Sequence, residues 1–352
     1  MQIRCFEDFR ALRAACPPLA DAAHAGELFE TLDWFELLSR EALPAGTPLQ
    51  LLAATADTGA TLCLPLMRQG RNIASLSNYY TGIYGPISGG DSNEGWRGEA
   101  LTALCRHLRT ACPRPAAIRL YPLDPSGELF RDMRDALTSA GYRVGSHFGF
   151  GNWHLPCAGL CFADYFAGRP SALRNTVRRA RSRLDKAGQW NITIHTAPGA
   201  GLDQAIADFE TIYRRSWKSA ESYPGFVREL CRLAARRGWL RLGVLSLDGA
   251  AIASQIWLFD NGKASIFKLA YDPDAAHLSP GSVLTAAMME NALDRDAARE
   301  IDYLSGDDAY KQDWMSHRRE RHGLVAFDLA MLRGLLAALR HFGGQTLRRL
   351  RP

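Results

Sequence analysis

The sequence predicts an α/β protein with two domains and mixed, mainly antiparallel sheets flanked by helices. Its 352 residues exceed the usual size of a single hydrophobic core. In the second half, three apolar runs are joined by Asp248-Gly249 and Asn261-Gly262, the dipeptides typical of tight antiparallel hairpins. Stretches with helical spacing stand on both sides of these strands, so we expect helices to flank the sheet.

The first half, to about Leu155, has the alternating patterns of a mixed α/β domain. Helical spacing of apolar residues predicts helices over 28–38, 99–110 and 130–140. Short apolar runs predict strands over 49–54, 60–66 and 117–121. Residues 78–90 are rich in Tyr, Gly and Pro and are expected to form a loop. No residues of this half have catalytic spacing.

A boundary is expected where glycine and proline interrupt the pattern, around residues 156–171. The linker predicted over 157–188 contains a helix whose apolar stripe is Leu173, Val177, Ala180 and Leu184. The opposite side of this helix is cationic and carries Arg174, Arg178, Arg181 and Arg183. Two readings stay open for it: a solvated face between domains, or a surface for the phosphates of a nucleotide, RNA or anionic lipid.

The second half has an unusual and informative order of elements. A strand over 191–196 is followed by a helix that starts at Asp203 and a second helix over 226–237. The three hairpin strands follow, and then a loop that leads into a helix over 281–294. A strand over 300–304, a helix with Tyr310 and a last strand over 324–329 complete the order β-α-α-β-β-β-α-β-α-β.

This order resembles the GNAT acyltransferase superfamily over residues 189–329. Three motifs sharpen the resemblance, besides the Arg-rich helix: Tyr213-x-x-x-Trp217-Lys218, His277-Leu278-Ser279-Pro280-Gly281 and Gly306-Asp307-Asp308-x-Tyr310-Lys311-x-x-Trp314. Together they are similar to the double-domain branch that contains the CelD-like acetyltransferases and the Fem peptidyltransferases. The resemblance implies tandem GNAT-like domains: a degenerate one over 1–156 and the catalytic one over 189–329, followed by a basic tail over 330–352.

The resemblance also implies an N-acyltransferase that takes an acyl group from acetyl-CoA or another acyl-CoA. GNAT enzymes carry Gln/Arg-x-x-Gly-x-Gly/Ala at the helix that takes the pyrophosphate, whereas this chain has His277-Leu278-Ser279-Pro280-Gly281-Ser282. Fem relatives use aminoacyl-tRNA instead of coenzyme A. A second hypothesis is therefore a tRNA-dependent transferase, and a third is a non-catalytic partner in polysaccharide or envelope synthesis.

The helix that begins near Gly281 is the candidate site for the donor's phosphates. Free N–H groups at a helix start attract phosphate, and Gly281 permits close approach beside Ser279 and Ser282. The alternative is an ordinary helix capped by Ser279. On the preceding strand, backbone N–H groups at Leu269, Ala270 and Tyr271 are expected to polarise the carbonyl of the donor.

By resemblance, Tyr310 protonates the leaving thiolate and Lys311 offsets negative charge on the reacting group. Asp307 is the candidate base for the acceptor ammonium, and Asp302 is a weaker rival. The alternative for these residues is structural, since the first turn of a helix often carries solvated polar side chains and either Asp307 or Asp308 can cap it.

Further residues are candidates for the substrate pocket. Lys268 lies mid-strand and either faces the cleft or extends its amine to solvent from an edge. Gln255 and Trp257 alternate onto one face of the neighbouring strand, where they line the cleft or pack. Trp217 and Lys218 at a helix end, with Trp314 further on, are expected to wall the acceptor site, although an aromatic on such a stripe is often core.

Composition favours a cytoplasmic protein without a metal site. The net charge of +5 is mild, and the eight cysteines form no C-x-x-C pair, so reduced thiols are expected. The N-terminus carries acids where a secretion signal has an apolar stretch, and no apolar run is long enough to span a membrane. Residues 331–351 form a basic, partly amphipathic segment that docks on the domain or rests on an anionic membrane. We expect the acceptor to be a small-molecule or amino-sugar amine.

Overall fold

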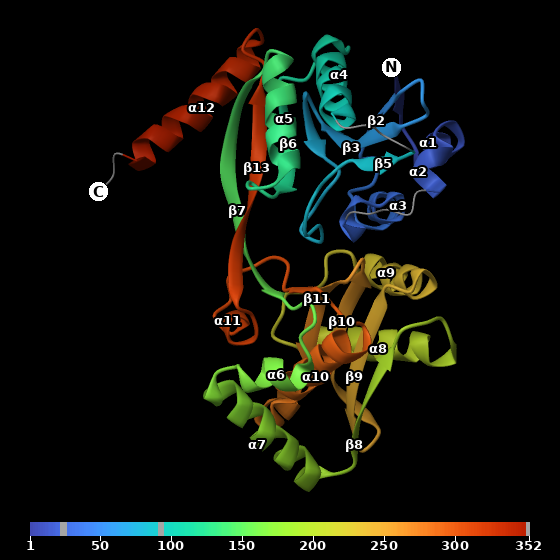
Figure 1. Ribbon diagram of the computed structural model, residues 1–352, viewed down its shortest axis with the longest axis vertical. Coiled ribbons are helices and arrows are strands. Elements are labelled where there is room, and N and C mark those ends of the chain that lie inside the picture. The colour runs from blue at the N-terminus through green and yellow to red at the C-terminus, as the bar shows by residue number, and fades with distance from the viewer. Residues whose placement is uncertain (22–26, 91–94, 350–352) are drawn as a thin grey trace. The chain divides into compact units, whose positions relative to one another are not determined.

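The computed structural model describes residues 1–21, 27–90 and 95–349 and divides the chain into two compact units (Figure 1). Unit 1 comprises residues 1–150 and 320–352, and unit 2 comprises residues 151–319. Two strands, β7 (Arg143–Pro156) and β13 (His317–Phe327), cross this division. The expected boundary after residue 156 and the expected domain 189–329 therefore do not coincide with the compact units.

In unit 1, the strands follow the order β1-β2-β3-β4-β6-β13-β7. The first four strands pair in antiparallel fashion, β4 is parallel to β6, and β13 is antiparallel to β6. The short β5 pairs with β3. The bounds are β1 Gln2–Phe6, β2 Leu49–Thr55, β3 Thr61–Gln69, β4 Asn72–Ser75, β5 Ile87–Gly89 and β6 Ala117–Leu123.

The helices of unit 1 include a C-terminal helix that docks by one face. Ala338 of that helix packs on Ala117 of β6 and on Val325 and Phe327 of β13. Helices α1, α2 and α4 contact the N-terminal strands, and α4 also contacts α5. The bounds are α1 Phe9–Ala15, α2 Pro17–Asp21, η1 Leu28–Glu30, α3 Leu32–Glu41, α4 Trp96–Thr110, α5 Glu128–Ser139 and α12 Leu332–Arg349.

In unit 2, the strand order is β7-β12-β11-β10-β9-β8. The predicted meander is confirmed: β8 to β11 are successive antiparallel neighbours. Its turns hold Asp248 and Asn261 at φ 50° and 48°, followed by glycines with positive φ, as tight hairpins require. The bounds are β8 Trp190–His195, β9 Leu240–Leu247, β10 Ala250–Asp260, β11 Lys263–Tyr271 and β12 Glu300–Asp302.

The helices of unit 2 flank this sheet, so the mixed α/β fold class is confirmed. The predicted stripe of α7 is buried in one core cluster with α10 and the sheet. Helix α10 lies close to β9 because Gly243 has no side chain; a Cβ there would lie 2.5 Å from the sulfur of Met288. The bounds are α6 Phe162–Ala167, α7 Ser171–Ala187, α8 Ala200–Arg215, α9 Pro224–Arg237, η2 Pro273–Leu278, α10 Pro280–Glu290, η3 Asn291–Arg295 and α11 Lys311–Trp314.

Some elements differ from the expectation. The segment 156–171 contains α6, and the last strand begins at His317 instead of residue 324. Strand β7 has 14 residues and includes Gly149 and Gly151, in a segment for which the sequence predicts no element. A side chain at Gly151 would collide with the carboxylate of Asp307, so tertiary packing selects glycine inside this strand. Helix α8 begins at Ala200, before the expected cap Asp203.

Strand β11 is open along part of one edge, and this opening positions the site. β12 runs parallel to β11 but pairs with residues 263–265 only. On the other side, β10 follows β11 as far as Tyr271, with a bulge where Ile256 pairs with Lys268 and Trp257 with Ile266. Beyond residue 265, β11 is therefore not paired with β12, and this end of the strand lies close to the start of α10.

Candidate functional site

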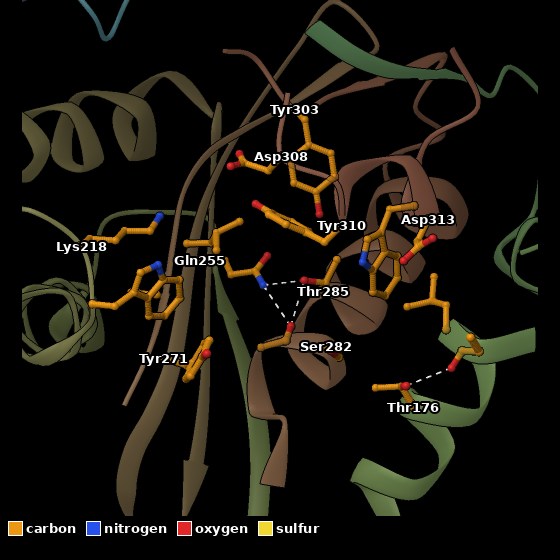
Figure 2. Close-up of a pocket in the computed structure, with 17 residues that line it drawn as sticks. Thr176, Lys218, Gln255, Tyr271, Ser282, Thr285, Tyr303, Asp308, Tyr310 and Asp313 are labelled. Carbon is orange, nitrogen blue, oxygen red and sulfur yellow. Dashed lines mark hydrogen bonds between the residues drawn. The ribbon is translucent and has the colours of Figure 1, made fainter. Parts of the chain in front are cut away.

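A cavity of about 480 Å3 lies in unit 2, between the end of β11, the start of α10 and residues 303–314 (Figure 2). Pockets for small molecules commonly measure ~300–1,000 Å3. The predicted site residues that line it are Trp217, Lys218, Gln255, Leu269, Ala270, Tyr271, Gly281, Ser282, Tyr310 and Trp314. Five predicted residues are not among its lining residues: Lys268, Trp257, Ser279, Asp307 and Lys311.

Helix α10 presents its N-terminus to this cavity through Gly281 and Ser282. The helix begins at Pro280, and Ser279 precedes it in the left-handed region at φ 53°, without a side-chain cap bond. The Cβ of a side chain at Gly281 would lie 3.3 Å from the Tyr271 ring, so glycine lets the aromatic ring sit against the helix start. Helix N-terminal N–H groups bear partial positive charge, so this rim suits an anionic group.

A buried chain of hydrogen bonds fastens the start of α10 to the sheet. The amide nitrogen of Gln255 donates to the Thr285 hydroxyl at 2.7 Å and to the Gly281 carbonyl at 3.3 Å (Figure 2). The Gln255 carbonyl accepts from the indole N–H of Trp257 at 2.9 Å. Trp257 is thus a core residue that acts through Gln255, and the predicted contact of Trp257 with the cleft is not seen.

Tyr310 extends its hydroxyl toward the middle of the cavity (Figure 2). Its ring packs edge-on against Tyr303, with the ring centroids 5.9 Å apart. Burial, assisted by the negative charge of Asp308, raises the pKa of Tyr310 to about 12. The phenol is therefore protonated near neutral pH, which is the state that a general acid requires.

Lys311 points into the turn that precedes Tyr310. The lysine is 4% exposed, and burial lowers its pKa. Its amine donates to the carbonyl of Ser305 at 2.7 Å and of Gly306 at 3.2 Å, and pairs with Asp308 at 3.2 Å. Because an ammonium has three protons, these contacts engage all of them. The contacts favour a positioning role for Lys311, while the predicted electrostatic role stays a prediction.

The two carboxylates considered as bases are both engaged elsewhere. Asp307 forms a two-point ion pair with Arg318, at 2.8 and 2.7 Å, which lowers the pKa of the carboxyl. Asp302 is 1% exposed and accepts from Asn152 at 2.5 Å and from Arg319 at 2.6 Å. Asp308 lines the cavity instead. The role predicted for Asp307 is untested, and its geometry does not support it.

The wall opposite Tyr310 is formed by Trp217 and Lys218. The Trp217 ring lies 4.5 Å from the Tyr271 ring, centroid to centroid, and is 58% exposed, so it is not a core aromatic. Lys268 does not reach the cavity; its amine pairs with Glu221 at 2.6 Å and lies over the Tyr213 ring. Of the two lysines, Lys218 is the one that lines the cavity.

Helix α7 contributes a third wall through Ala172, Leu173 and Thr176. This contribution was missed because those residues read as a helix start and a buried stripe. The arginines of α7 are exposed on its other side, and Arg183 donates to the carbonyl of His277 at 2.9 Å. The cationic helix therefore lies beside the segment that leads into α10.

Further lining residues missed by the sequence reasoning are Thr285, Tyr303 and Asp313. Thr285 lies four residues after Gly281 and therefore on the same face of the helix. The helix start predicted at Gly281 was sufficient to predict that Thr285 also faces the cavity. Tyr303 lies directly beyond the short strand β12, at a strand end where α/β folds often place functional groups.

The comparisons with known proteins agree with this fold. Residues 171–312 match the family model described as an acetyltransferase (GNAT) domain. No curated protein matches the sequence. Among solved structures, FemX is similar with a TM-score of 0.62 at 14% identity, over 96% of this chain and 99% of that one.

A second similar structure is the C-terminal domain of a putative lysylphosphatidylglycerol synthetase from Agrobacterium fabrum. Its TM-score is 0.54 at 12% identity, and the match covers 93% of this chain and 96% of that domain. Both likenesses concern the fold, and both extend over nearly the whole chain. Residues 171–312 thus have the fold of a GNAT domain and match its family model, as the resemblance in the sequence implied.

Proposed function

We propose that this protein is an N-acyltransferase that moves an acyl group from acyl-CoA, in the first instance acetyl-CoA, to the amine of a small molecule or amino sugar. The observation that carries the proposal is the convergence of three features on one cavity. These are the open edge at the end of β11, the N-terminus of α10 and the protonated phenol of Tyr310. An acyl-CoA needs a binding site for its phosphates, a hydrogen-bond donor for its thioester carbonyl and an acid that protonates the departing thiolate.

In the proposed mechanism, the donor lies along residues 269–271 with its phosphates at Gly281 and Ser282. Backbone N–H groups of β11 polarise the thioester carbonyl. The neutral acceptor amine attacks the carbonyl carbon, a C–N bond forms, and the C–S bond breaks. Tyr310 gives its hydroxyl proton to the departing sulfur, and the proton that the amine nitrogen loses as the amide forms is returned to the Tyr310 phenolate through water. Lys311 holds the turn that positions Tyr310, and Trp217, Trp314 and Gln255 shape the cavity.

The runner-up donor is aminoacyl-tRNA, and one observation favours it. Exposed arginines of α7 lie on the helix that also lines the cavity, where an RNA acceptor stem would meet them. RNA binding through several phosphates weakens steeply with salt, whereas one helix start that holds a pyrophosphate gives a shallow salt dependence. A non-catalytic role is the third alternative, and the solvent-accessible Tyr310 in a formed cavity supports an enzyme instead.

The donor class is tested by measuring the affinity for acetyl-CoA and for charged tRNA at 50 and 200 mM salt. Micromolar binding of acetyl-CoA that changes little with salt is the expected result. Tight tRNA binding that falls by at least about tenfold between the two salt concentrations, without acetyl-CoA binding, would replace the proposed donor. Binding of neither donor would favour the non-catalytic alternative.

We also propose a cytoplasmic location with peripheral contact to an anionic membrane through α12. All eight cysteines are free thiols, as suits a reducing compartment. No helix in the described part of the chain has the length and apolar character to cross a membrane. Helix α12 nevertheless exposes a row of leucines, Leu332, Leu335, Leu336 and Leu339, on the side away from docked Ala338. Residues 329–352 contain arginines and no acids, which suits anionic lipid.

A further inference from the structure

Three lysines lie at or near the cavity, and the two that do not line it each have a carboxylate partner. Lys268 pairs with Glu221 at 2.6 Å, and Lys311 pairs with Asp308 at 3.2 Å. No described residue forms an ion pair with Lys218, the lysine that lines the cavity. A partly buried ammonium without such a partner is costly, so its neutral form is favoured.

The surroundings of Lys218 also favour the neutral form of its amine. Its amine lies 5.7 Å from the centroid of the Tyr213 ring and 5.8 Å from that of Trp217, two rings that screen it from water. Lys268 contacts the same Tyr213 ring at 5.3 Å, so two amines approach one aromatic group. Burial first, and then the positive charges of Lys268 and Lys311, lower the pKa of Lys218 to about 8, against the smaller opposing effect of Asp308 and Glu221.

The geometry places this amine opposite the acid. Figure 2 shows Lys218 and Tyr310 entering the cavity from different walls, with the space above Gln255 between them. A base must reach the attacking amine while the acid reaches the leaving sulfur, on the far side of the reacting carbon. The carboxylates of Asp302 and Asp307 are bound to arginines instead.

We propose that neutral Lys218 is the catalytic base, which accepts a proton from the ammonium form of the acceptor. The proposal rests on the acyltransferase function argued above. The amine of Lys218 takes one proton from the acceptor ammonium, and the freed amine attacks the thioester. The second nitrogen proton leaves to water as the amide forms, and Tyr310 protonates the sulfur. Transfer of the proton from Lys218 to the Tyr310 phenolate, through water, restores both groups, and one proton is released overall.

The first test measures the protonation of Lys218 without a substrate. Trace labelling with isotopic acetic anhydride between pH 6 and 11, read by mass spectrometry, reports the midpoint at which each lysine becomes reactive. In the folded protein we expect a midpoint near pH 8 for Lys218. In urea, where the side chain is exposed, the midpoint should lie near the ordinary lysine value of ~10.4. Equal midpoints in the two states would overturn the proposal.

The second test separates a base from an anchoring cation. Lys218→Arg keeps the charge but cannot lose a proton, and Lys218→Met removes both properties. Acetyl transfer from acetyl-CoA is measured with glucosamine, lysine and putrescine, using the amine that the wild type acetylates fastest. Both variants should lose at least ~10²-fold in turnover while retaining acetyl-CoA affinity. Retained activity in Lys218→Arg alone would identify an anchoring cation and overturn the proposal.

The experiments can contradict the acyltransferase function and the role of Lys218 separately. If the wild type neither binds acetyl-CoA nor acetylates any of the three amines, the proposed donor or acceptor is wrong. The labelling midpoint still decides on Lys218 in that case, because it needs no substrate. If transfer occurs and both variants turn over normally, the acyltransferase stands and Lys218 is not its base.

Discussion

The side-chain amide of Gln255 donates to the hydroxyl of Thr285 at 2.7 Å, and this bond joins strand β10 to the second turn of α10. Thr285 in turn donates to the Gly281 carbonyl at 2.9 Å. The proposed phosphate site is therefore held by a buried network in the sheet, instead of by the loop that precedes it. Since Gln255 is 2% exposed, water cannot replace these bonds if they are lost.

Replacing Gln255 by Leu should weaken both stability and donor binding. The substitution leaves the indole N–H of Trp257 and the Thr285 hydroxyl without this partner, which costs ~1–3 kcal/mol for each buried polar group. Urea unfolding and calorimetric titration with acetyl-CoA measure the two effects. Gln204→Leu, at an exposed position of α8, is the matched control. Unchanged stability in Gln255→Leu would show that the network does not hold α10.

Replacing Tyr310 by Phe should lower turnover by about 10²-fold with little change in acetyl-CoA affinity. The phenol acts only when the sulfur departs, so its loss affects the transition state more than the bound donor. The pKa of about 12 predicts that the phenol stays protonated, and hence active as an acid, throughout pH 6 to 10. Tyr79→Phe, at an exposed position of unit 1, serves as the control. Near-normal turnover in Tyr310→Phe would remove it as the acid.

Asp307→Asn should leave turnover within about threefold of the wild type, because a group with a structural ion pair adds little to the transition state. The ion pair with Arg318 lowers the pKa of Asp307. Its contribution to stability is therefore present above the ordinary aspartate pKa and is lost as the pH falls through the lowered value. Steady-state kinetics with the wild type and the variant measure the change in turnover. A hundredfold loss of turnover would return Asp307 to the role of base.

The exposed leucines of α12 should bind anionic vesicles without contributing to folding. Leu335→Glu with Leu339→Glu is expected to keep the unfolding midpoint and to abolish sedimentation with vesicles of phosphatidylcholine and phosphatidylglycerol. Ala338→Glu, on the docked face, should lower the midpoint instead, because Ala338 is 4% exposed in a packed cluster. A wild type that sediments equally with pure phosphatidylcholine, or with neither vesicle, would contradict the proposed membrane contact.

Local signals were sufficient to predict the parts of the fold that local interactions form. The hairpin turns at Asp248-Gly249 and Asn261-Gly262 specify the meander, and the apolar stripe of α7 specifies its buried face. Strand β7 could not be predicted in this way. Its glycines at 149 and 151 disfavour a strand locally, and they are required because Tyr121 and Asp307 occupy the space of a side chain. Those neighbours are distant in the sequence.

The sequence was sufficient to predict which segments form the site, but not which role each residue has in it. The helix start at Gly281 and the end of β11 follow from the order of elements, and both line the cavity. The choice between Asp307 and Asp308 depends on Gly306, whose φ of 106° turns the chain, and on Arg318, eleven residues later. Burial lowers the pKa of Lys218, and the positive charges of Lys268 and Lys311, from two other elements, lower it further. No spacing rule contains these relationships.

The most direct test of the proposed function is calorimetric titration of the protein with acetyl-CoA, repeated on Gly281→Glu and Gly281→Ala. The glutamate places a negative charge at the start of α10, whereas alanine adds only the Cβ that approaches Tyr271. We predict micromolar binding to the wild type, a modest loss for alanine and no measurable binding for glutamate. Equal binding by Gly281→Glu would contradict the phosphate site, and no binding by the wild type would contradict the acyl-CoA donor itself.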